Sequence, residues 1–566
     1  MVNIPNPHKK VPMMFQAQIG GRCQLNYIDK NADQSDIERW TSEWLERADS
    51  VLPNFSPGVE AKAYQINWRF VTNGGQDDGI IRPVLGAKGI PFYPGSSMKG
   101  AFAQACTSEE RRRYCGYEIN SKDMAPGILR FHGGYPTNNQ WQEKLIDIVH
   151  PQQQWQVKTQ EKEGGAFPLI SLHKPELFFG ISSSILLEEN EWNEVWKIWE
   201  KALSLGIGCR VSAGYGQPKK FSGKVIYNTV LEGRGIASKL LNNTAEFRPN
   251  LFKASIRGHA LRIFGGLTDS KTAEKAVEGL FGGIQGDGGT VGLLSMRFTE
   301  KSLDIGTFGI GNWQVPTYQV QGTLSWFVTE SLSDEKRQAL QILITLLTRF
   351  SMVLGGFGRS WRRADHRLFY EEYYQGSRQK PLIGCHWQWQ GDRALLKDVS
   401  VRKIEQLGPF INTLRDHAQK WLEINHLPID PTNYAKNWRE AWHPNSVQVW
   451  GRLTEYGADD SLAIRWLHQS YRKANPPFGI AEGSIYKSSI TGEMSRIGCL
   501  WHRMYPVVRL LQNKEDASKK IGKATSEYLE FLTIFPDGSR ESSQFLEFLE
   551  TSSEFQLLWP ISTDDG

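Results

Sequence analysis

Hydrophobic and polar residues alternate in several stretches of the chain, which is the pattern of a strand with one buried face. In the clearest stretch, Tyr64, Ile66, Trp68 and Phe70 occupy every second position and fall on one face. Strands are predicted over residues 15–27, 64–72, 167–187, 224–231, 291–298, 317–328 and 501–510.

Other stretches place apolar residues three or four positions apart, as an amphipathic helix requires. Ser35 and Glu38 form a capping-box pattern at the start of the first such stretch. Two of the predicted helices end at glycines, Gly206 and Gly355, which commonly terminate helices. Helices are predicted over residues 35–49, 97–106, 191–205, 255–264 and 334–354. Helices mixed with antiparallel strands predict an α+β protein.

Two segments share a pattern of a serine, an apolar residue, a basic residue and a glycine before a helix-compatible run. The first is PGSSMKGAF at residues 94–102, and the second is ASIRGHALR at residues 254–262. A glycine-rich basic loop follows each segment later in the chain, at residues 206–210 and 355–359. A pattern that recurs in the same order indicates a duplicated domain.

With 566 residues, 40% of them apolar and 20 of them Trp, the chain has material for about two to four domains. The repeat divides it into two domains and a remainder. We expect a first domain over residues 1–222, the core of a second over 223–375, and a C-terminal extension over 376–566 that partly completes the second.

Composition narrows the functional class only slightly. The net charge of +5 is compatible with nucleic-acid binding but does not establish it, because 66 basic and 61 acidic residues nearly cancel. The six cysteines lack CxxC spacing, so reduced thiols in a cytoplasmic protein are expected rather than a zinc site. No apolar run approaches about 18 residues and residues 1–12 lack a signal-peptide core, so neither a membrane span nor export is expected.

The turn at residues 94–100 opens a predicted helix. Its N–H groups, the hydroxyls of Ser96 and Ser97 and the ammonium of Lys99 would suit a phosphate. The plainer interpretation is an ordinary helix start with a solvated lysine, and the residues alone favour neither. The GxxxxGK[ST] spacing of a Walker A loop is absent.

The two glycine-rich loops combine a pliable backbone with positive charge and aromatic rings, a composition that suits single-stranded RNA. The plainer interpretation, a glycine helix end and a solvated basic turn, fits one such loop better than two at matching positions. RNA binding is expected from residues in or beside the two motif segments and the two loops, namely Ser96, Ser97, Lys99, Arg210, Tyr215, Lys219, Arg257, Arg359, Trp361 and Arg362.

Two further patterns carry less weight. The sequence GADD at residues 457–460 resembles a metal-binding polymerase hairpin but lacks convincing flanking strands, so a plain turn is favoured. His132, His150 and His173 have no spacing that supports a histidine nuclease or a metal site.

The segment IPFYPGSSMKGAF, followed by GIGCRVSAGYGQ, resembles the RAMP superfamily of CRISPR-associated proteins, in particular backbone subunits of type III effector complexes. The segments ASIRGHALR, GTVGLLSMRF and GGFGRSWRRADHRLF resemble a more divergent member. The resemblance covers roughly residues 10–370, and two fused units suggest the type III-D form. It implies two tandem modified ferredoxin-like (RRM-like) domains. It also implies three partners: guide RNA, complementary target RNA, and other effector subunits including the large polymerase-like one.

In active members of this superfamily, an aspartate before the proline-glycine-serine-serine motif cuts target RNA. The matching stretch here contains Asp77 and Asp78, which would orient the RNA 2′-hydroxyl or hold Mg²⁺ or another divalent cation. Residues 231–249 of the second unit contain no aspartate, so that unit is expected to bind without cutting. The alternatives are a solvated Asp-Asp-Gly turn at this place and, for the whole chain, an inert scaffold of the same complex.

The polar stretch 150–167 predicts an extended hairpin or mobile loop. The resemblance implies that a hairpin at this place inserts between nucleotides of the guide–target duplex, with Trp155 and Phe167 as the wedge. Because the stretch lacks a periodic apolar face, deletion of residues 153–166 is expected to leave the fold intact.

Overall fold

The computed structural model describes residues 34–561 with gaps, and it confirms an α+β fold. The gaps are residues 73, 75, 78–79, 121–122, 150–153, 160–166, 222, 241–243, 286–287, 310, 312–313, 359–367, 369–383, 469–484, 486–487, 493–496, 514–515 and 517–518. The chain forms two compact units. The first comprises Met1–His150, Gly165–Lys224 and Lys239–Thr244, and the second comprises Pro151–Gly164, Val225–Ser238 and Ala245–Gly566.

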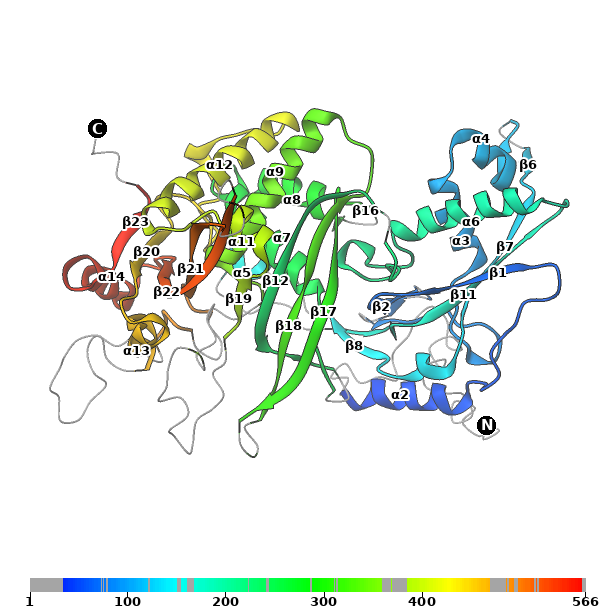
Figure 1. Cartoon of the computed structure of the whole chain (residues 1–566), viewed down its shortest axis with the longest axis horizontal. Coiled ribbons are helices and arrows are strands. Elements are labelled where there is room, and N and C mark those ends of the chain that lie inside the picture. Colours follow the sequence, from blue (N-terminus) through cyan, green and yellow to red (C-terminus); the bar gives the residue numbers. More distant parts are fainter. Residues whose placement is uncertain are drawn as a thin grey trace, which may run out of the picture. The chain divides into compact units, whose positions relative to one another are not determined.

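A three-stranded antiparallel sheet of order β1-β11-β7 supports the first unit (Figure 1). Helix α3 (Gly95–Ala105) packs on β7 and on helix α6 (Glu189–Ser204). The rings of Phe179 on the sheet and Trp199 on α6 lie 4.9 Å apart, and both side chains are buried. The strands are β1 (Glu60–Gln65), β11 (Glu176–Ser183) and β7 (Leu129–Pro136).

Smaller sheets surround this core in the first unit. The largest has the order β3-β4-β9-β8, and β2 pairs with β10. Helix α2 (Gln34–Arg47) packs through Trp44 against Trp141, with ring centroids 5.3 Å apart. The strands are β2 (Arg69–Phe70), β3 (Gln76–Asp77), β4 (Ile80–Ile81), β8 (Ile146–Val149), β9 (Phe167–Ile170) and β10 (Leu172–His173), with a further pair β5 (Gly116–Glu118) and β6 (Met124–Pro126).

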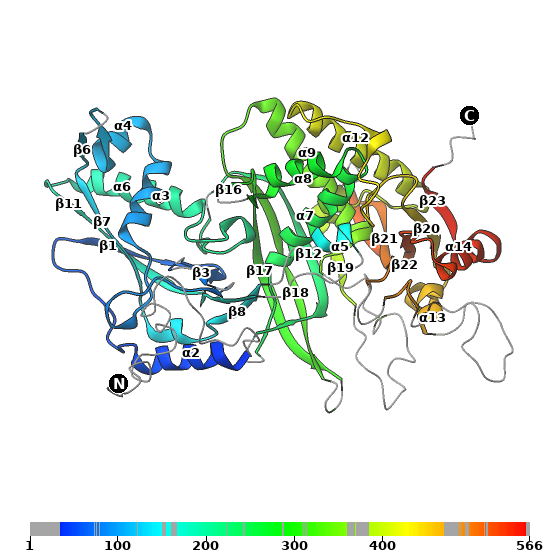
Figure 2. The same cartoon turned by 180° about the vertical axis from the view of Figure 1, so that it is seen from behind.

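The second unit contains a sheet of order β17-β18-β12-β19, with helices against one of its faces (Figure 2). The long strands pair antiparallel over most of their length. The strands are β12 (Val225–Ile236), β17 (Leu294–Phe308), β18 (Val315–Val328) and β19 (His386–Trp389). The helices are α7 (Asn250–Gly265), α8 (Ser270–Phe281) and α9 (Asp334–Phe350).

A second sheet of order β21-β22-β20-β23 shares the hydrophobic core of this unit. It comes entirely from the C-terminal part of the chain, while β19 from the same part extends the first sheet beside β12. Its strands are β20 (Gln448–Leu453), β21 (Leu500–Gln512), β22 (Lys520–Ile534) and β23 (Gln556–Trp559). Helices α11 (Asp392–Lys397), α12 (Leu407–Ile424), α13 (Leu462–His468) and α14 (Arg540–Ser552) complete this part.

The predicted helices correspond to α2, α3, α6, α7 and α9, and the predicted strands of the second unit correspond to β12, β17, β18 and β21. Three stretches differ from prediction. Residues 64–72 divide between β1 and β2, because Ile66 leaves the sheet to bridge Pro218. Residues 167–187 form β9, β10 and β11, each in a different sheet. The predicted strand 15–27 lies outside the described residues.

The prediction of an extended hairpin or mobile loop over residues 150–167 is wrong for residues 154–158, whereas Phe167 at the end of the stretch pairs with Val149 in the antiparallel β8–β9 ladder. Residues Gln154–Lys158 form helix α5, which belongs to the second unit and packs on α7. Val157 is fully buried in the core of that unit, so one apolar side chain anchors an otherwise polar segment.

One helical stretch, Asp334–Gly355, is long and apolar enough to cross a membrane, although the sequence was expected to contain no such run. It comprises α9 and the π-helical turn η7 (Ser351–Gly355). Its most apolar window is 67% buried inside the unit, where Leu343 and Leu347 contribute to the core. It therefore serves as a core helix of the second unit.

Candidate nucleic-acid interface

The proline-glycine-serine-serine motif of the first unit forms the start of α3. Pro94 has extended backbone angles and caps the helix, so the first turn begins at Gly95. A Cβ atom at Gly95 would lie 2.1 Å from the carbonyl oxygen of Phe131, so only glycine allows this approach to β7. The side chains of Met98 and Phe102 lie on the inner face of α3 and are buried in the core of the first unit.

The outer face of the same turn is presented to solvent. Ser96, Ser97 and Lys99 are all exposed. The first N–H groups of any helix lack partners within the helix and carry partial positive charge. The turn therefore combines amide donors, two hydroxyls and an ammonium on one accessible surface.

The glycine-rich loop of the first unit spans residues 206–216. Its two ends are hydrogen-bonded to each other, and its amides donate to β2 and to Val71, the residue after β2. The Cys209 amide donates to the carbonyl of Val71 at 2.8 Å, and the Gly216 amide donates to that of Arg69 at 2.7 Å. A Cβ atom at Gly208 would lie 2.2 Å from the Val71 oxygen, and the φ angle there is +79°. Glycine is thus required at Gly208 by both space and backbone angle.

Tyr93 joins the motif to this loop. Its hydroxyl donates to the carbonyl of Ser97 at 3.2 Å and lies near the Gly208 amide of the loop. Burial raises the pKa of Tyr93 to about 12, although the nearby Gly208 amide opposes that shift. The structure therefore brings together the two segments of the first unit that the sequence singled out, through a tyrosine that was not among the expected site residues.

The other expected residues of this loop differ in accessibility. Arg210 is half-buried with a left-handed backbone at φ +59°, and Lys219 is exposed. Tyr215 is buried: its hydroxyl donates to Asp147 Oδ2 at 2.9 Å and its ring lies 4.6 Å from that of Trp68. The expectation that Tyr215 stacks on RNA is therefore not met in this structure, because the ring is already packed.

The second unit places its own motif against its own glycine-rich turn. The Gly358 amide donates to Ser255 Oγ at 3.0 Å, and His259 Nε2 lies 3.2 Å from the Gly356 carbonyl oxygen. A Cβ atom at Gly355 would lie 2.2 Å from the His259 ring. The pairing of a motif helix with a glycine turn is thus repeated, although here the contacts are buried.

Arg257, expected to bind RNA, makes an internal contact. Its guanidinium Nη1 donates to the carbonyl oxygen of Gly282 at 2.6 Å, and burial lowers its pKa. Helix α7 begins at Asn250, more than a turn before Ser255, so the motif amides lie within the helix rather than at its start. Arg359, Trp361 and Arg362 lie outside the described residues.

The expected wedge residues do not form a hairpin in the described part of the chain. Trp155 is half-buried in α5, where the Gln156 carbonyl oxygen accepts from Arg439 Nη2 at 2.9 Å and Lys158 pairs with Glu274. Phe167 opposes Val149 in the β8–β9 ladder, and its side chain lies outside the described residues. Trp155 thus lies on a helix of the second unit and not on a hairpin, and its role as a wedge stays a prediction.

Of the two expected catalytic aspartates, the structure describes the backbone of Asp77, the last residue of β3. Asp77 pairs with Ile80 between β3 and β4, while its side chain and all of Asp78 lie outside the described residues. Within the part of the chain that the structure describes, no group of three or more His, Cys, Asp or Glu side chains could hold a metal ion. The described donors thus do not form a divalent-cation site by themselves.

The GADD sequence is structural. It forms the 3-10 helix η11 (Gly457–Asp460), and the Asp460 carboxylate lies 3.2 Å from the guanidinium of Arg452, which also contacts buried Glu530. His132 lies on the surface, 2.8 Å from Ser182 Oγ. His150 lies outside the described residues, and His173 lines a pocket of the first unit.

No protein-family model matches the chain, and no curated protein matches its sequence. A solved structure of the type III-B Cmr-beta bound to cognate target RNA matches 33% of this chain and 75% of that chain. The sequence identity is 16% and the TM-score is 0.22.

Proposed function

We propose that the chain is an RNA-binding subunit of a type III CRISPR effector complex. The observation that carries the proposal is the convergence of the α3 start and the 206–216 loop through Tyr93. These are the two segments whose sequences resemble RAMP backbone subunits. The buried counterpart around Ser255 and Gly358 adds support, because the same pairing recurs in the second unit.

In this proposal the exposed surface of the first unit contacts the guide-RNA backbone. Ser96, Ser97 and the α3 amides bind a phosphate, and Lys99 and Lys219 supply charge. The other partners are complementary target RNA and neighbouring effector subunits, including the large polymerase-like one. The cytoplasm is the proposed location.

The proposal includes cleavage of target RNA in the first unit by Asp77 or Asp78. A carboxylate can accept the 2′-hydroxyl proton, and with a further donor it can bind Mg²⁺ or another divalent cation. The second unit binds without cutting, because residues 231–249 offer no aspartate. The competing function is an inert scaffold of the same complex.

One experiment separates the two functions. The assembled complex is incubated with Mg²⁺ and RNA complementary to its guide, using wild type and the Asp77→Ala/Asp78→Ala variant. Loss of general acid–base catalysis should slow this subunit's cut by on the order of a hundredfold or more, with RNA binding unchanged. Chelation of the metal should have the same effect.

Asp123→Ala is the matched control, because the carboxylate of this exposed aspartate of the same unit accepts from Asn120 in a local turn. It should cut at the wild-type rate. If the double aspartate variant still cuts at every original position, the chain is the scaffold.

A further inference from the structure

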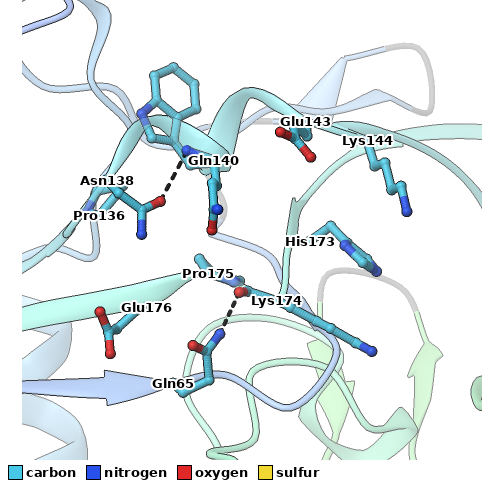
Figure 3. A pocket seen from close by; sticks show the side chains of 11 residues that line it. Gln65, Pro136, Asn138, Gln140, Glu143, Lys144, His173, Lys174, Pro175 and Glu176 are labelled. Atoms are coloured by element: carbon cyan, nitrogen blue, oxygen red, sulfur yellow. Dashed lines mark hydrogen bonds between the residues drawn. The ribbon is translucent and has the colours of Figure 1, made fainter. Parts of the chain in front are cut away.

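A pocket of about 290 Å³ opens in the first unit where several strands end (Figure 3). Gln65 at the end of β1, Pro136 at the end of β7 and His173 at the end of β10 contribute to its wall. The remaining wall comes from η4 (Asn139–Gln142) with its flanking residues, and from residues 174–176 between β10 and the start of β11. None of these positions belongs to the motif or the glycine-rich loop described above.

Two lysines of this pocket hold a left-handed backbone. Lys144 has φ +52° and Lys174 has φ +45°. Long side chains without a glycine's freedom rarely adopt this region, and such strain clusters at functional sites. Of the five described non-glycine residues with a positive φ, these two line the same pocket.

The surrounding structure holds both lysines in place. The buried guanidinium of Arg69 donates to the carbonyl of Lys144 at 2.9 Å and to Ser171 Oγ at 2.7 Å. The Gln65 side chain donates to the carbonyl of Lys174 at 2.5 Å. Side chains from β1 and β2 therefore hold the left-handed backbones of Lys174 and Lys144, and the pocket is preformed without a ligand.

The lining groups differ in charge from one side of the pocket to the other. In Figure 3, Lys144, His173 and Lys174 lie on one side, Asn138 and Glu176 lie on the other, and Glu143 lies between Gln140 and Lys144. The Glu176 carboxylate accepts from the Thr137 hydroxyl at 2.8 Å, which orients it. One side thus offers two ammonium groups and an imidazole with one carboxylate near them, and the opposite side offers a carboxamide and a carboxylate.

We infer that this pocket binds one ribonucleotide unit. The phosphate lies against Lys144, Lys174 and His173, whose N–H donors match anionic oxygens. The base edge and ribose hydroxyls lie against Asn138 and Glu176, which can donate to and accept from them. A pocket at the small end of the range for ligand sites has room for one such unit and not for several.

The same chemistry is offered by a free nucleoside monophosphate and by one nucleotide of single-stranded RNA. The RNA form rests on the proposed function, whereas the free-nucleotide form does not. The two sources are distinguished by titrating the purified full chain with each of the four nucleoside monophosphates, and separately with a short single-stranded RNA.

The variant that tests the pocket is Lys144→Asn with Lys174→Asn. Asparagine tolerates the left-handed region better than most residues, so the backbone is kept while both charges are removed. Lys88→Asn is the matched control: Lys88 has the same backbone type at φ +62° and pairs with Asp49, away from the pocket lining. Thermal unfolding of each variant checks that the first unit is folded.

We expect at least one nucleoside monophosphate, or the RNA, to bind wild type and to bind the double variant at least about tenfold more weakly, with Lys88→Asn unchanged. If the double variant binds RNA more weakly and no mononucleotide binds the wild type, the natural ligand of the pocket is one nucleotide of single-stranded RNA. The inference is overturned if neither ligand is affected by the double variant, or if Lys88→Asn weakens binding equally.

A Lys99→Gln variant measured in parallel separates this inference from the proposed function. If Lys99→Gln leaves RNA binding intact while the pocket variant loses mononucleotides, the pocket stands and the proposed RNA surface fails. If Lys99→Gln weakens RNA and the pocket variant binds both ligands normally, the pocket fails and the RNA surface stands.

Discussion

In the first unit, the motif serines and Lys99 lie exposed at the start of α3, whereas in the second unit Ser255 and His259 are buried within α7. The difference comes from where each helix begins. Helix α3 starts at Gly95, inside its motif, while α7 starts at Asn250, before its motif. The same residue pattern therefore presents donors to solvent in one unit and serves internal packing in the other.

The exposed motif of the first unit and the buried motif of the second have different consequences for RNA binding. The glycine turn of the second unit is bound by the motif side chains themselves, through Ser255 and His259. The loop of the first unit is held by backbone groups and Tyr93, so the side chains of Ser96, Ser97 and Lys99 stay available. Recurrence of the motif and its glycine turn therefore does not imply recurrence of an exposed binding surface.

The largest expected effect concerns the buried contact of the second unit. Gly355→Ala places a methyl group against the His259 ring, which is itself packed by Phe350 and Trp501. Such overpacking should destabilise the second unit by about 3 kcal/mol, measured by urea unfolding. Gly100→Ala on α3 is the control: no atom lies within 4 Å, and removing a helical glycine should stabilise by up to about 1 kcal/mol. Equal effects would mean that the two motifs are packed alike.

A second test concerns α5, which the sequence assigned to a dispensable loop. Val157→Ala should cost about 2 kcal/mol of unfolding free energy, because the side chain is fully buried in the core of the second unit. Deleting residues 154–159 should lower the melting temperature further, since Arg439 also loses its acceptor at Gln156. A deletion variant that melts like wild type would restore the loop interpretation.

A third test compares serines of the two motifs. Ser255→Ala removes the acceptor of the Gly358 amide and should cost about 1 to 3 kcal/mol, because a part-buried donor is left unsatisfied. Ser97→Ala changes an exposed side chain and should alter stability by less than about 0.5 kcal/mol. Chemical denaturation of both variants provides the measurement, and similar values would contradict the contrast drawn between the units.

The smallest expected effect is on the salt dependence of RNA binding. Lys99→Gln should reduce the slope of log affinity against log salt concentration by about 1, as expected for one lost phosphate contact. Arg257→Gln should leave the slope unchanged, because its guanidinium donates to the Gly282 carbonyl. Fluorescence anisotropy at several salt concentrations measures both, and a reduced slope for Arg257→Gln would extend the RNA surface to the second unit.

Much of the secondary structure could be predicted from local pattern. Helices α2, α3, α6, α7 and α9 follow from apolar spacing and from glycines at their ends. The pattern failed for α5, because one buried valine in a polar segment creates no periodicity. The alternating pattern also places Arg69 on the face opposite Trp68 and Phe70, where a charged side chain is expected to be exposed. In the structure Arg69 is fully buried, and it donates to the carbonyl of Lys144, which lines the pocket.

The sequence by itself determined the α+β class, the two motif–loop pairs and the residues of the proposed RNA surface, but not the role of Tyr93 in joining motif and loop. Only the tertiary structure decided which of those side chains are accessible. It buried Tyr215 against Trp68 and Asp147, bound Arg257 to a carbonyl, and gathered Lys144 and Lys174 in one pocket. The physical reason is that exposure depends on what packs against a residue, and those partners come from distant parts of the chain.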